Sequence, residues 1–325
     1  MIRKFLKFIF LWLAPPVVTI VLLLVFIGMG MYPQQGSLTA EKIIYIESGS
    51  STKGIAQQLA AEDVIDETGR YIFLAAAKIR HSSLKAGEYA FQPSSSIKDA
   101  LLLLESGKTY QRQITIPEGL MSFEIVALLN TGETLTGEIT DIPAEGALLP
   151  ETYSYSRGDD KNKIIARMKT AMDNALTELW EKRNPDTLVK SPEETVILAS
   201  VVEKETGVAS ERPRVAGVFM NRIKTGMPLQ TDPTVIYALT MGKKKLYRPL
   251  LRKDLNIESP YNTYLVTGLP PTPIANPGRK SLEAVLNPET HDFIYFVADG
   301  TGGHAFAKTH EEHLRNVAKW REIQK

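Results

Sequence analysis

The hydrophobic and polar positions divide this chain into stretches with different patterns. A short basic segment, residues 1–7, precedes an uncharged and largely apolar run over residues 8–32. Residues 33–42 are mostly polar and contain Gly, Ser and Gln, which is typical of a linker. Beyond the linker, alternating segments and segments with apolar residues three and four positions apart follow one another. The pattern therefore predicts an α+β protein behind an N-terminal apolar helix.

The apolar run is long enough to cross a membrane. At about 1.5 Å per helical residue, residues 8–32 can cross a hydrocarbon core of about 30 Å. Pro15-Pro16 kinks a simple helix, so the continuous span can start at the prolines. A cleavable signal peptide would have a shorter apolar region and a small-x-small cleavage site, which the residues after Gly28 do not supply. Because basic residues stay inside, we predict a retained single-pass transmembrane helix with the rest of the chain across the membrane.

Residues 43–109 form the first compact unit that the pattern predicts. Ile43–Glu47 and Lys85–Phe91 read as strands, and Ser96–Glu105 has its apolar residues on one helical face. Helical patterns also fill the sequence between the two strands. A small mixed unit of this kind is usually a binding or spacing module.

Residues 110–325 form a second, larger unit. A strand and a turn are predicted over Gln113–Gly119, and a long helix over Lys161–Arg183. The next predicted helix begins after Ser191, which has the features of an N-cap, with Pro192 in the first helical position. A glutamate three residues after the cap completes a capping box, and the helix is expected to run to about Thr206.

Glu205, near the end of that helix, is the main candidate for chemistry. At 100° per residue it shares a stripe with apolar residues, whereas Glu203 and Lys204 point elsewhere. The apolar members of the stripe are Leu198, Val201 and Val202. Burial raises the pKa of a carboxyl, as a general acid near neutral pH requires. The alternative is a solvated glutamate, or one paired with Arg212 or Arg214.

Composition and charge exclude several classes of function. The 38 Lys and Arg nearly cancel the 37 Asp and Glu, and the basic residues are scattered, which argues against a nucleic-acid partner. A near-neutral chain is compatible with a largely uncharged polymer such as a glycan. The chain has no cysteine, which excludes disulfides, thiolate nucleophiles and thiolate-bound zinc.

The segments after Glu205 predict another helix and then polar loops. Ser210 is the expected N-cap of this helix and Gly226 its end. The loops are rich in amide, hydroxyl and aromatic groups, which suit a sugar groove because amides bind hydroxyls and tyrosines pack on pyranose rings. Ordinary turn chemistry is the alternative. The candidate sugar contacts are Asn221, Gln230, Asp232, Tyr261 and Asn262.

Short motifs follow one another in a fixed order through the second unit. They cover Ala199–Thr206, Arg214–Arg222, Leu229–Tyr237, Tyr261–Tyr264, Gly268–Pro271, Ile274–Gly278, Tyr295–Gly300 and Gly302–Phe306. Together they resemble the MltG/YceG-like family of endolytic murein transglycosylases. The match at Leu149–Tyr153 is looser, because family members tend to have Phe-Pro-Asp-Thr-Tyr where this chain has Leu-Pro-Glu-Thr-Tyr.

The resemblance implies an arrangement of domains and a location. It implies a LysM-like membrane-proximal module over residues 43–109 and a catalytic YceG-like domain over residues 110–325, with a lysozyme-like or transglycosylase-like helical active-site region. The chain would lie in the cell inner (cytoplasmic) membrane, with the catalytic domain on the periplasmic side. Its implied partners are peptidoglycan glycan strands, the membrane and nearby wall synthases, the penicillin-binding proteins. No cofactor is expected.

The resemblance also implies a reaction. In this family the second Glu of the Glu-Lys-Glu-Thr string is catalytic, which corresponds to Glu205. It would cleave the MurNAc-GlcNAc bond of nascent strands as general acid and base, while the C6 hydroxyl of the muramic acid attacks and leaves a 1,6-anhydromuramyl end. An ordinary hydrolase needs a second carboxylate, for which Asp232 is the candidate. A glycan-binding scaffold without activity is a further alternative.

Histidines near the C-terminus raise the question of a metal. His310 and His313 are three residues apart, which is not the spacing of the histidine pair in zinc proteases, and a solvated helix face is the simpler interpretation. His304 stands after two glycines and is a better candidate for lining the groove. We therefore expect no metal site.

Overall fold

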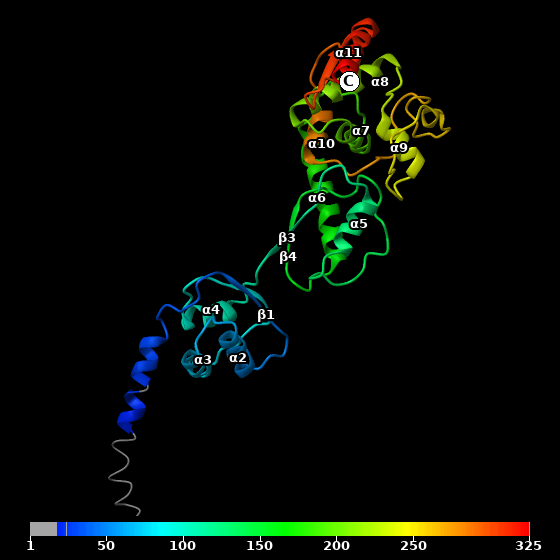
Figure 1. Cartoon of the computed structure of the whole chain (residues 1–325). Helices are drawn as coiled ribbons and strands as arrows, with labels where there is room; N and C mark the ends of the chain where they lie inside the picture. The colour runs from blue at the N-terminus through cyan, green and yellow to red at the C-terminus, as the bar shows by residue number, and fades with distance from the viewer. Residues whose placement is uncertain (1–17, 24, 325) are drawn as a thin grey trace, which may run out of the picture. The chain divides into compact units, whose positions relative to one another are not determined.

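The computed structural model describes residues 18–23 and 25–324 (Figure 1). The chain divides into two compact units, Met1–Arg112 and Gln113–Lys325.

The predicted transmembrane helix over residues 8–32 lies partly outside the described residues. Residues 18–23 and 25–31 are helical, and their large apolar side chains are exposed, with Phe26 at 76% and Met29 at 72%. No helix among the described residues is both long and apolar enough to cross a membrane. The single-pass helix therefore stays a prediction.

The first unit combines a two-stranded sheet with helices. β1 (Lys42–Ile46) pairs antiparallel with β2 (Gly87–Phe91), and Ile44 stands opposite Tyr89. The helices are α2 (Thr52–Ala61), α3 (Glu67–Ile79) and α4 (Ile97–Ser106). The order of elements is thus strand, helix, helix, strand, helix, close to the predicted bounds.

Local chemistry explains where these helices begin and end. Ser51, Asp66 and Ser96 occupy the N-caps, and each side chain accepts a hydrogen bond from a backbone N–H of the first turn. Gly107 ends α4 in the left-handed conformation that glycine adopts without strain. Apolar side chains of both strands and of these helices then form one core.

The second unit is mostly helical with short sheets. Its helices are α5 (Ser122–Asn130), α6 (Lys161–Glu181), α7 (Pro192–Glu205), α8 (Arg212–Thr225), α9 (Asp232–Thr240), α10 (Arg279–Leu286) and α11 (His310–Ile323), with short turns of 3-10 helix at η1 (Ala209–Glu211) and η2 (Arg252–Asn256). The strands pair as β3 (Arg112–Thr115) with β4 (Thr152–Tyr155), and β5 (Tyr295–Ala298) with β6 (His304–Ala307).

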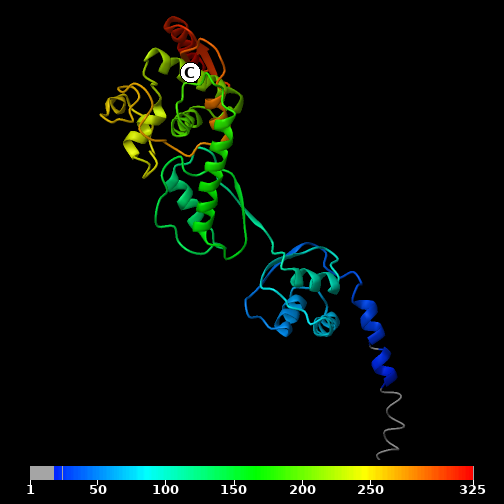
Figure 2. The same ribbon diagram turned by 180° about the vertical axis from the view of Figure 1, so that it is seen from behind.

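α6 is the long helix that both apolar clusters of this unit share (Figures 1 and 2). Its first half, with Ile164 and Met168, joins the α5 cluster, which also contains residues of α5 and of the segments around it. Its second half, with Met172 and Leu179, joins the α7 cluster, which contains residues of α7, α8 and α10. One helix therefore helps to build both parts of the core.

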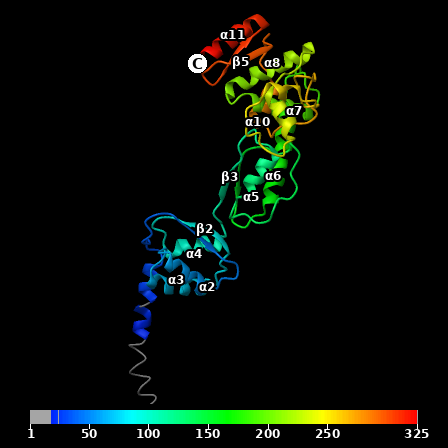
Figure 3. The same cartoon turned by 45° about the vertical axis from the view of Figure 1, so that its right-hand side comes forward.

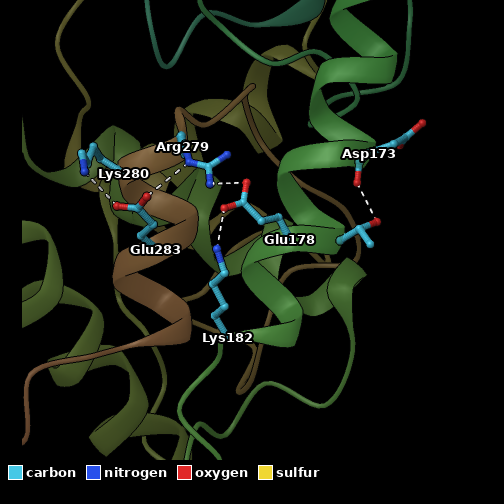
Figure 4. Close-up of polar contacts among 7 residues, drawn as sticks. Asp173, Glu178, Lys182, Arg279, Lys280 and Glu283 are labelled. Atoms are coloured by element: carbon cyan, nitrogen blue, oxygen red, sulfur yellow. Dashed lines mark hydrogen bonds and ion pairs between the residues drawn. The ribbon is translucent and has the colours of Figure 1, made fainter.

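Ion pairs cross from α6 to α10 on the surface (Figure 4). Glu178 accepts hydrogen bonds from Arg279 at 2.6 Å and from Lys182 at 2.8 Å, and these cations lower its pKa to about 2. Arg279 also contacts Glu283, which Lys280 contacts in turn. Because these side chains are exposed, their contribution to stability is small.

α7 is largely buried in the candidate site region. Leu198, Ala199, Val201 and Val202 are all fully buried, and α7 packs against α8 and α10 (Figure 3). Charged side chains follow this apolar stretch at the C-terminal end of the helix. That end carries Glu205.

Candidate active site

The bounds of α7 follow from its first residues, as predicted. The Ser191 hydroxyl accepts from the backbone N–H of Glu194 at 3.2 Å, and Pro192 opens the helix. The predicted capping box is incomplete, because the Glu194 carboxylate accepts from the N–H of Lys190 and not from that of Ser191. α7 ends at Glu205, and Thr206 already has extended backbone angles.

Glu205 is half-buried at the end of the apolar stripe that the sequence predicts. The Thr231 hydroxyl donates to its Oε2 at 2.6 Å. Burial raises the pKa of Glu205 above its ordinary value, and the hydrogen bond from Thr231 opposes that rise. Since Oε2 accepts the Thr231 proton, a protonated Glu205 carries its own proton on Oε1. The acid proton is therefore directed away from Thr231.

Charged groups around Glu205 also influence its pKa. His304 and Arg222 lower it, and the Asp232 carboxylate raises it. Arg222 is a buried cation that the sequence interpretation did not select as a site residue. Its guanidinium donates to the carbonyl of Ile294 at 2.7 Å and lies 5.8 Å from the ring of Phe296. These contacts hold the Arg222 guanidinium in place near Glu205.

Asp232 lies at the start of α9 and is exposed. Its Oδ1 accepts from the Tyr264 hydroxyl at 2.7 Å. Burial and this hydrogen bond raise the pKa of Tyr264, so the phenol stays a donor to the carboxylate. Asp232 and Tyr264 thus form one polar edge near Glu205.

The two asparagines predicted as sugar contacts are held by backbone groups. Asn221 donates to the carbonyls of His291 and Phe293 at 2.7 and 3.0 Å. Asn262 is fully buried, and its amide donates to the carbonyls of Leu255 and Ile257, both at 2.9 Å. Asn262 thus braces a loop, which corrects its prediction as a sugar contact.

The remaining loop candidates differ in exposure. Gln230 is exposed and has a left-handed backbone with φ of 49°. Tyr261 is 9% exposed, packs its ring 4.9 Å from that of Tyr237, and shares a hydrogen bond of 2.8 Å with Thr272. The face of Tyr261 is therefore mostly covered by protein, whereas Gln230 is open to a ligand.

His304 lies beside Glu211, a residue that the sequence interpretation did not select. The ring Nδ1 of His304 and Oε2 of Glu211 are 2.8 Å apart, and the backbone N–H of His304 donates to Oε1 at 2.9 Å. Ser210, the predicted N-cap of α8, lies instead within η1, and α8 begins at Arg212 with Pro213 in its first turn. That prediction was wrong by one residue, because Glu211 occupies the N-cap position and Pro213 stands in the first turn of α8.

Glu203 has quite different surroundings from Glu205. Its side chain is 5% exposed and accepts from Arg212 at 3.0 Å, from the N–H of Gly278 at 2.9 Å and from the Ser281 hydroxyl at 2.8 Å. Arg212 also contacts Glu118 at 2.9 Å. Glu203 therefore connects α7 to α8 and α10, a role that a helical wheel alone does not reveal.

A second carboxyl with a raised pKa lies at Glu145. Burial raises its pKa to about 7, although the backbone N–H and hydroxyl of Ser122 donate to it at 2.9 and 3.2 Å. The Asn276 amide donates to the same oxygen at 3.3 Å. Glu145 thus links the start of α5 to the loop before α10.

The predicted metal candidates do not gather into a ligand set. His313 stacks on Tyr295 with ring centroids 5.2 Å apart, and His310 lies 5.9 Å from the same ring. Within residues 18–23 and 25–324, no group of three or more His, Cys, Asp and Glu side chains could hold a metal ion. His313 therefore packs on Tyr295, and His310 is exposed.

Comparison with known proteins gives a consistent result. The YceG-like family model matches residues 44–319. The endolytic murein transglycosylase of Bacillus subtilis is 33% identical over 308 residues, covering 85% of this chain and 84% of that protein. The protein of the same name from Streptococcus pneumoniae is 30% identical, covering 84% of this chain and 57% of that longer protein.

A solved structure agrees with these relatives. The crystal structure of a YceG-like protein from Listeria monocytogenes is 32% identical in sequence, with a TM-score of 0.53. The alignment covers 85% of this chain and 99% of the Listeria chain. The similarity in sequence and fold thus extends over both units.

Proposed function

Because the chain belongs to the YceG-like family, we propose that it is a peptidoglycan lytic transglycosylase with Glu205 as its general acid and base. The observation that carries the proposal is the state of Glu205, which is half-buried and has a raised pKa. A carboxyl that keeps its proton toward neutral pH can donate it to a leaving-group oxygen. The names of the Bacillus and Streptococcus relatives support the same reaction.

The proposed reaction uses the sugar's own hydroxyl in place of water. The proton on Oε1 of Glu205 passes to the glycosidic oxygen between MurNAc and GlcNAc as the bond to the anomeric carbon breaks. The C6 hydroxyl of the muramic acid attacks that carbon and gives up its proton to the Glu205 carboxylate. The products are a 1,6-anhydromuramyl end and a free GlcNAc hydroxyl.

Asp232 supports a second candidate, an ordinary hydrolase. It is an exposed carboxylate whose charge raises the pKa of Glu205, as a second catalytic carboxylate would. Its hydrogen bond with Tyr264 favours a different role, in which the pair binds sugar hydroxyls. Gln230 and His304 are the further contacts that we propose.

Mass spectrometry of digested peptidoglycan tests these alternatives. The parent enzyme is expected to release anhydro ends, and Asp232→Asn is expected to keep forming them at a reduced rate. Reducing ends alone in the parent digest would sink the transglycosylase proposal. Complete loss of cleavage in Asp232→Asn, with an unchanged unfolding temperature, would favour the hydrolase.

We also propose that residues 8–32 anchor the chain in the inner membrane and hold the catalytic unit on the periplasmic side. The uncharged run after a basic segment supports this location. The site would then act on nascent strands near the penicillin-binding proteins, with residues 43–109 as a LysM-like module. Fractionation of cells tests the anchor: the full chain should sediment with membranes, and a chain lacking residues 1–32 should not.

A further inference from the structure

Two sequence motifs of the second unit meet beside Glu205. The loop before α9 carries Thr231, whose hydroxyl donates to Oε2 of Glu205 at 2.6 Å, and α7 contacts α9 directly (Figure 1). The loop over residues 261–264 carries Thr263. Thr231 and Thr263 are 1% exposed, and Thr234 in α9 is fully buried. The hydrogen bonds among these threonines are therefore shielded from water.

The three threonines form a closed ring of hydrogen bonds. The backbone N–H of Thr231 donates to the hydroxyl oxygen of Thr263 at 3.2 Å. The Thr234 hydroxyl lies 2.8 Å from that same oxygen and donates to the Thr231 carbonyl at 2.7 Å. The backbone N–H of Gln230 also donates to the Thr263 carbonyl at 2.9 Å. Thr263 thus holds two successive residues of the loop before α9.

The direction of each proton in the ring follows from the donors and acceptors. Because a carbonyl can only accept, the Thr234 hydroxyl uses its one proton on the Thr231 carbonyl. The proton between Thr234 and Thr263 must then come from the Thr263 hydroxyl, whose oxygen still accepts from the Thr231 N–H. The ring therefore fixes the Thr231 backbone and leaves the Thr231 hydroxyl to donate to Glu205.

The neighbours of Thr263 hold its loop in place. The Asn262 amide donates to two backbone carbonyls of the same loop, both at 2.9 Å. On the other side, the Tyr264 hydroxyl donates to Oδ1 of Asp232 at 2.7 Å, one residue beyond Thr231. The two loops are thus joined at Thr263 and again at Tyr264, so a shift of one loop must disturb the other.

Resting on the proposed function, we propose that Thr263 is a positioning residue for the general acid. It holds Thr231 so that the Thr231 hydroxyl stays on Oε2 of Glu205 and the acid proton stays on Oε1. Thr263 itself is too deeply buried to contact a sugar. A change at Thr263 removes none of the charged groups around Glu205, which are His304, Asp232 and Arg222.

The pH profile of kcat/KM on soluble glycan strands tests this role. Thr263→Val keeps the shape of the side chain but opens the ring, so the Thr231 hydroxyl loses its fixed place. Glu205 then lacks the bond that stabilises its charged form, and the alkaline limb should move upward by about one pH unit. On the acid side kcat should fall about tenfold, because the proton is no longer directed at the glycosidic oxygen, while KM should not change.

Three further variants separate positioning from stability. Thr263→Ser keeps the hydroxyl and should restore the limb of the parent. Thr234→Val opens the ring but keeps the bond of the Thr231 N–H, so its limb should move the same way by a smaller amount. Thr195→Val is the matched control, because Thr195 is a fully buried threonine near the start of α7 whose hydroxyl donates to the Ser191 carbonyl at 3.1 Å. It should leave the limb in place.

A double variant shows whether Thr263 acts through Thr231. Once Thr231→Val has removed the hydroxyl, adding Thr263→Val should move the limb no further, because both changes interrupt one chain of contacts. Shifts that add up in the double variant would mean that Thr263 influences Glu205 by another route, and this result would overturn the inference.

The outcomes also separate this inference from the proposed function. The limb of the parent in folded Thr263→Val would overturn the role of Thr263 and leave Glu205 as the acid. If Thr263→Val does not fold, the same result in folded Thr234→Val would overturn it. Undiminished cleavage by Glu205→Gln would overturn the proposed function itself, and the positioning role would fall with it.

Discussion

Glu203 and Glu205 lie two residues apart in one helix, yet the two faces of α7 give them opposite properties. Glu203 accepts from a guanidinium, a backbone N–H and a hydroxyl, so its charge is fully compensated. Glu205 accepts a hydrogen bond from Thr231, and burial raises its pKa. The difference teaches that the partners across the helix, and not the residue type, decide which carboxylate is structural and which can hold a proton for chemistry.

Replacing Glu205 with Gln should have the largest effect of these changes, and the effect should be on activity. Without an acid, glycan cleavage should fall about 10³-fold, within the range for a positioned acid or base. The unfolding temperature should stay the same or rise, because a costly buried carboxyl is removed. The release of soluble fragments from peptidoglycan measures the first effect and thermal unfolding the second. Cleavage at the parent rate would show that Glu205 is not the catalytic acid.

Replacing Glu203 with Gln should lower the stability of the protein and leave its activity largely unchanged. Loss of one partner of a buried ion pair leaves Arg212 less compensated, and we expect the free energy of unfolding to fall by about 3 kcal/mol. The ratio of anhydro to reducing ends should not change. Urea unfolding followed by circular dichroism measures the loss. A fully stable variant with altered products would reverse the roles of the two glutamates.

Glu145 sharpens the comparison, because it also has a raised pKa but is part of a structural link. Its pKa rises from 4.5 to about 7 on folding, so the folded chain binds more protons between these values. The contribution of Glu145 to stability should therefore be fully present below about pH 4.5. It should decrease by about 1 to 3 kcal/mol as the pH rises toward 7. Glu145→Gln should remove this part of the pH dependence. Parallel pH profiles for parent and variant would contradict the assignment.

Replacing Thr231 with Val should give the smallest effect. The lost hydrogen bond stabilised the charged form of Glu205, so the pKa of the acid should rise further. Because the acid must be protonated, the alkaline limb of kcat/KM should move upward by about one pH unit. Thr231→Ser, which keeps the hydroxyl, is the control and should behave like the parent. An unchanged alkaline limb would show that the Thr231 hydroxyl does not influence the pKa of the catalytic acid.

Sequence patterns predicted the parts of the site that depend on local chemistry. Ser191 and Pro192 determine the start of α7 within one turn, and the apolar stripe places Glu205 at its end. The loop residues were harder to predict, because an asparagine side chain gives no sign of whether it faces a sugar or a carbonyl of its own loop. Asn262 is the clear example, since both of its donors bind carbonyls a few residues earlier.

The contacts that the sequence pattern could not predict are made with partners distant in sequence. Glu203 meets Ser281 and Gly278 from α10 and its preceding loop, and Glu211 meets His304 from β6. A helical wheel of α7 or α8 does not reveal these contacts. The glycine before His304 was the available signal, because a glycine next to a polar residue often marks a close approach of two backbone segments.

The shared helix α6 has a consequence for how the second unit unfolds. Ile164 and Met168 are anchored in one apolar cluster, and Met172 and Leu179 in the other. Loss of either cluster removes part of the packing surface of α6 and weakens the other cluster, so the two should melt as one cooperative unit. Amide protons along both halves of α6 should then exchange with a single protection free energy, and α7 should not open before the rest.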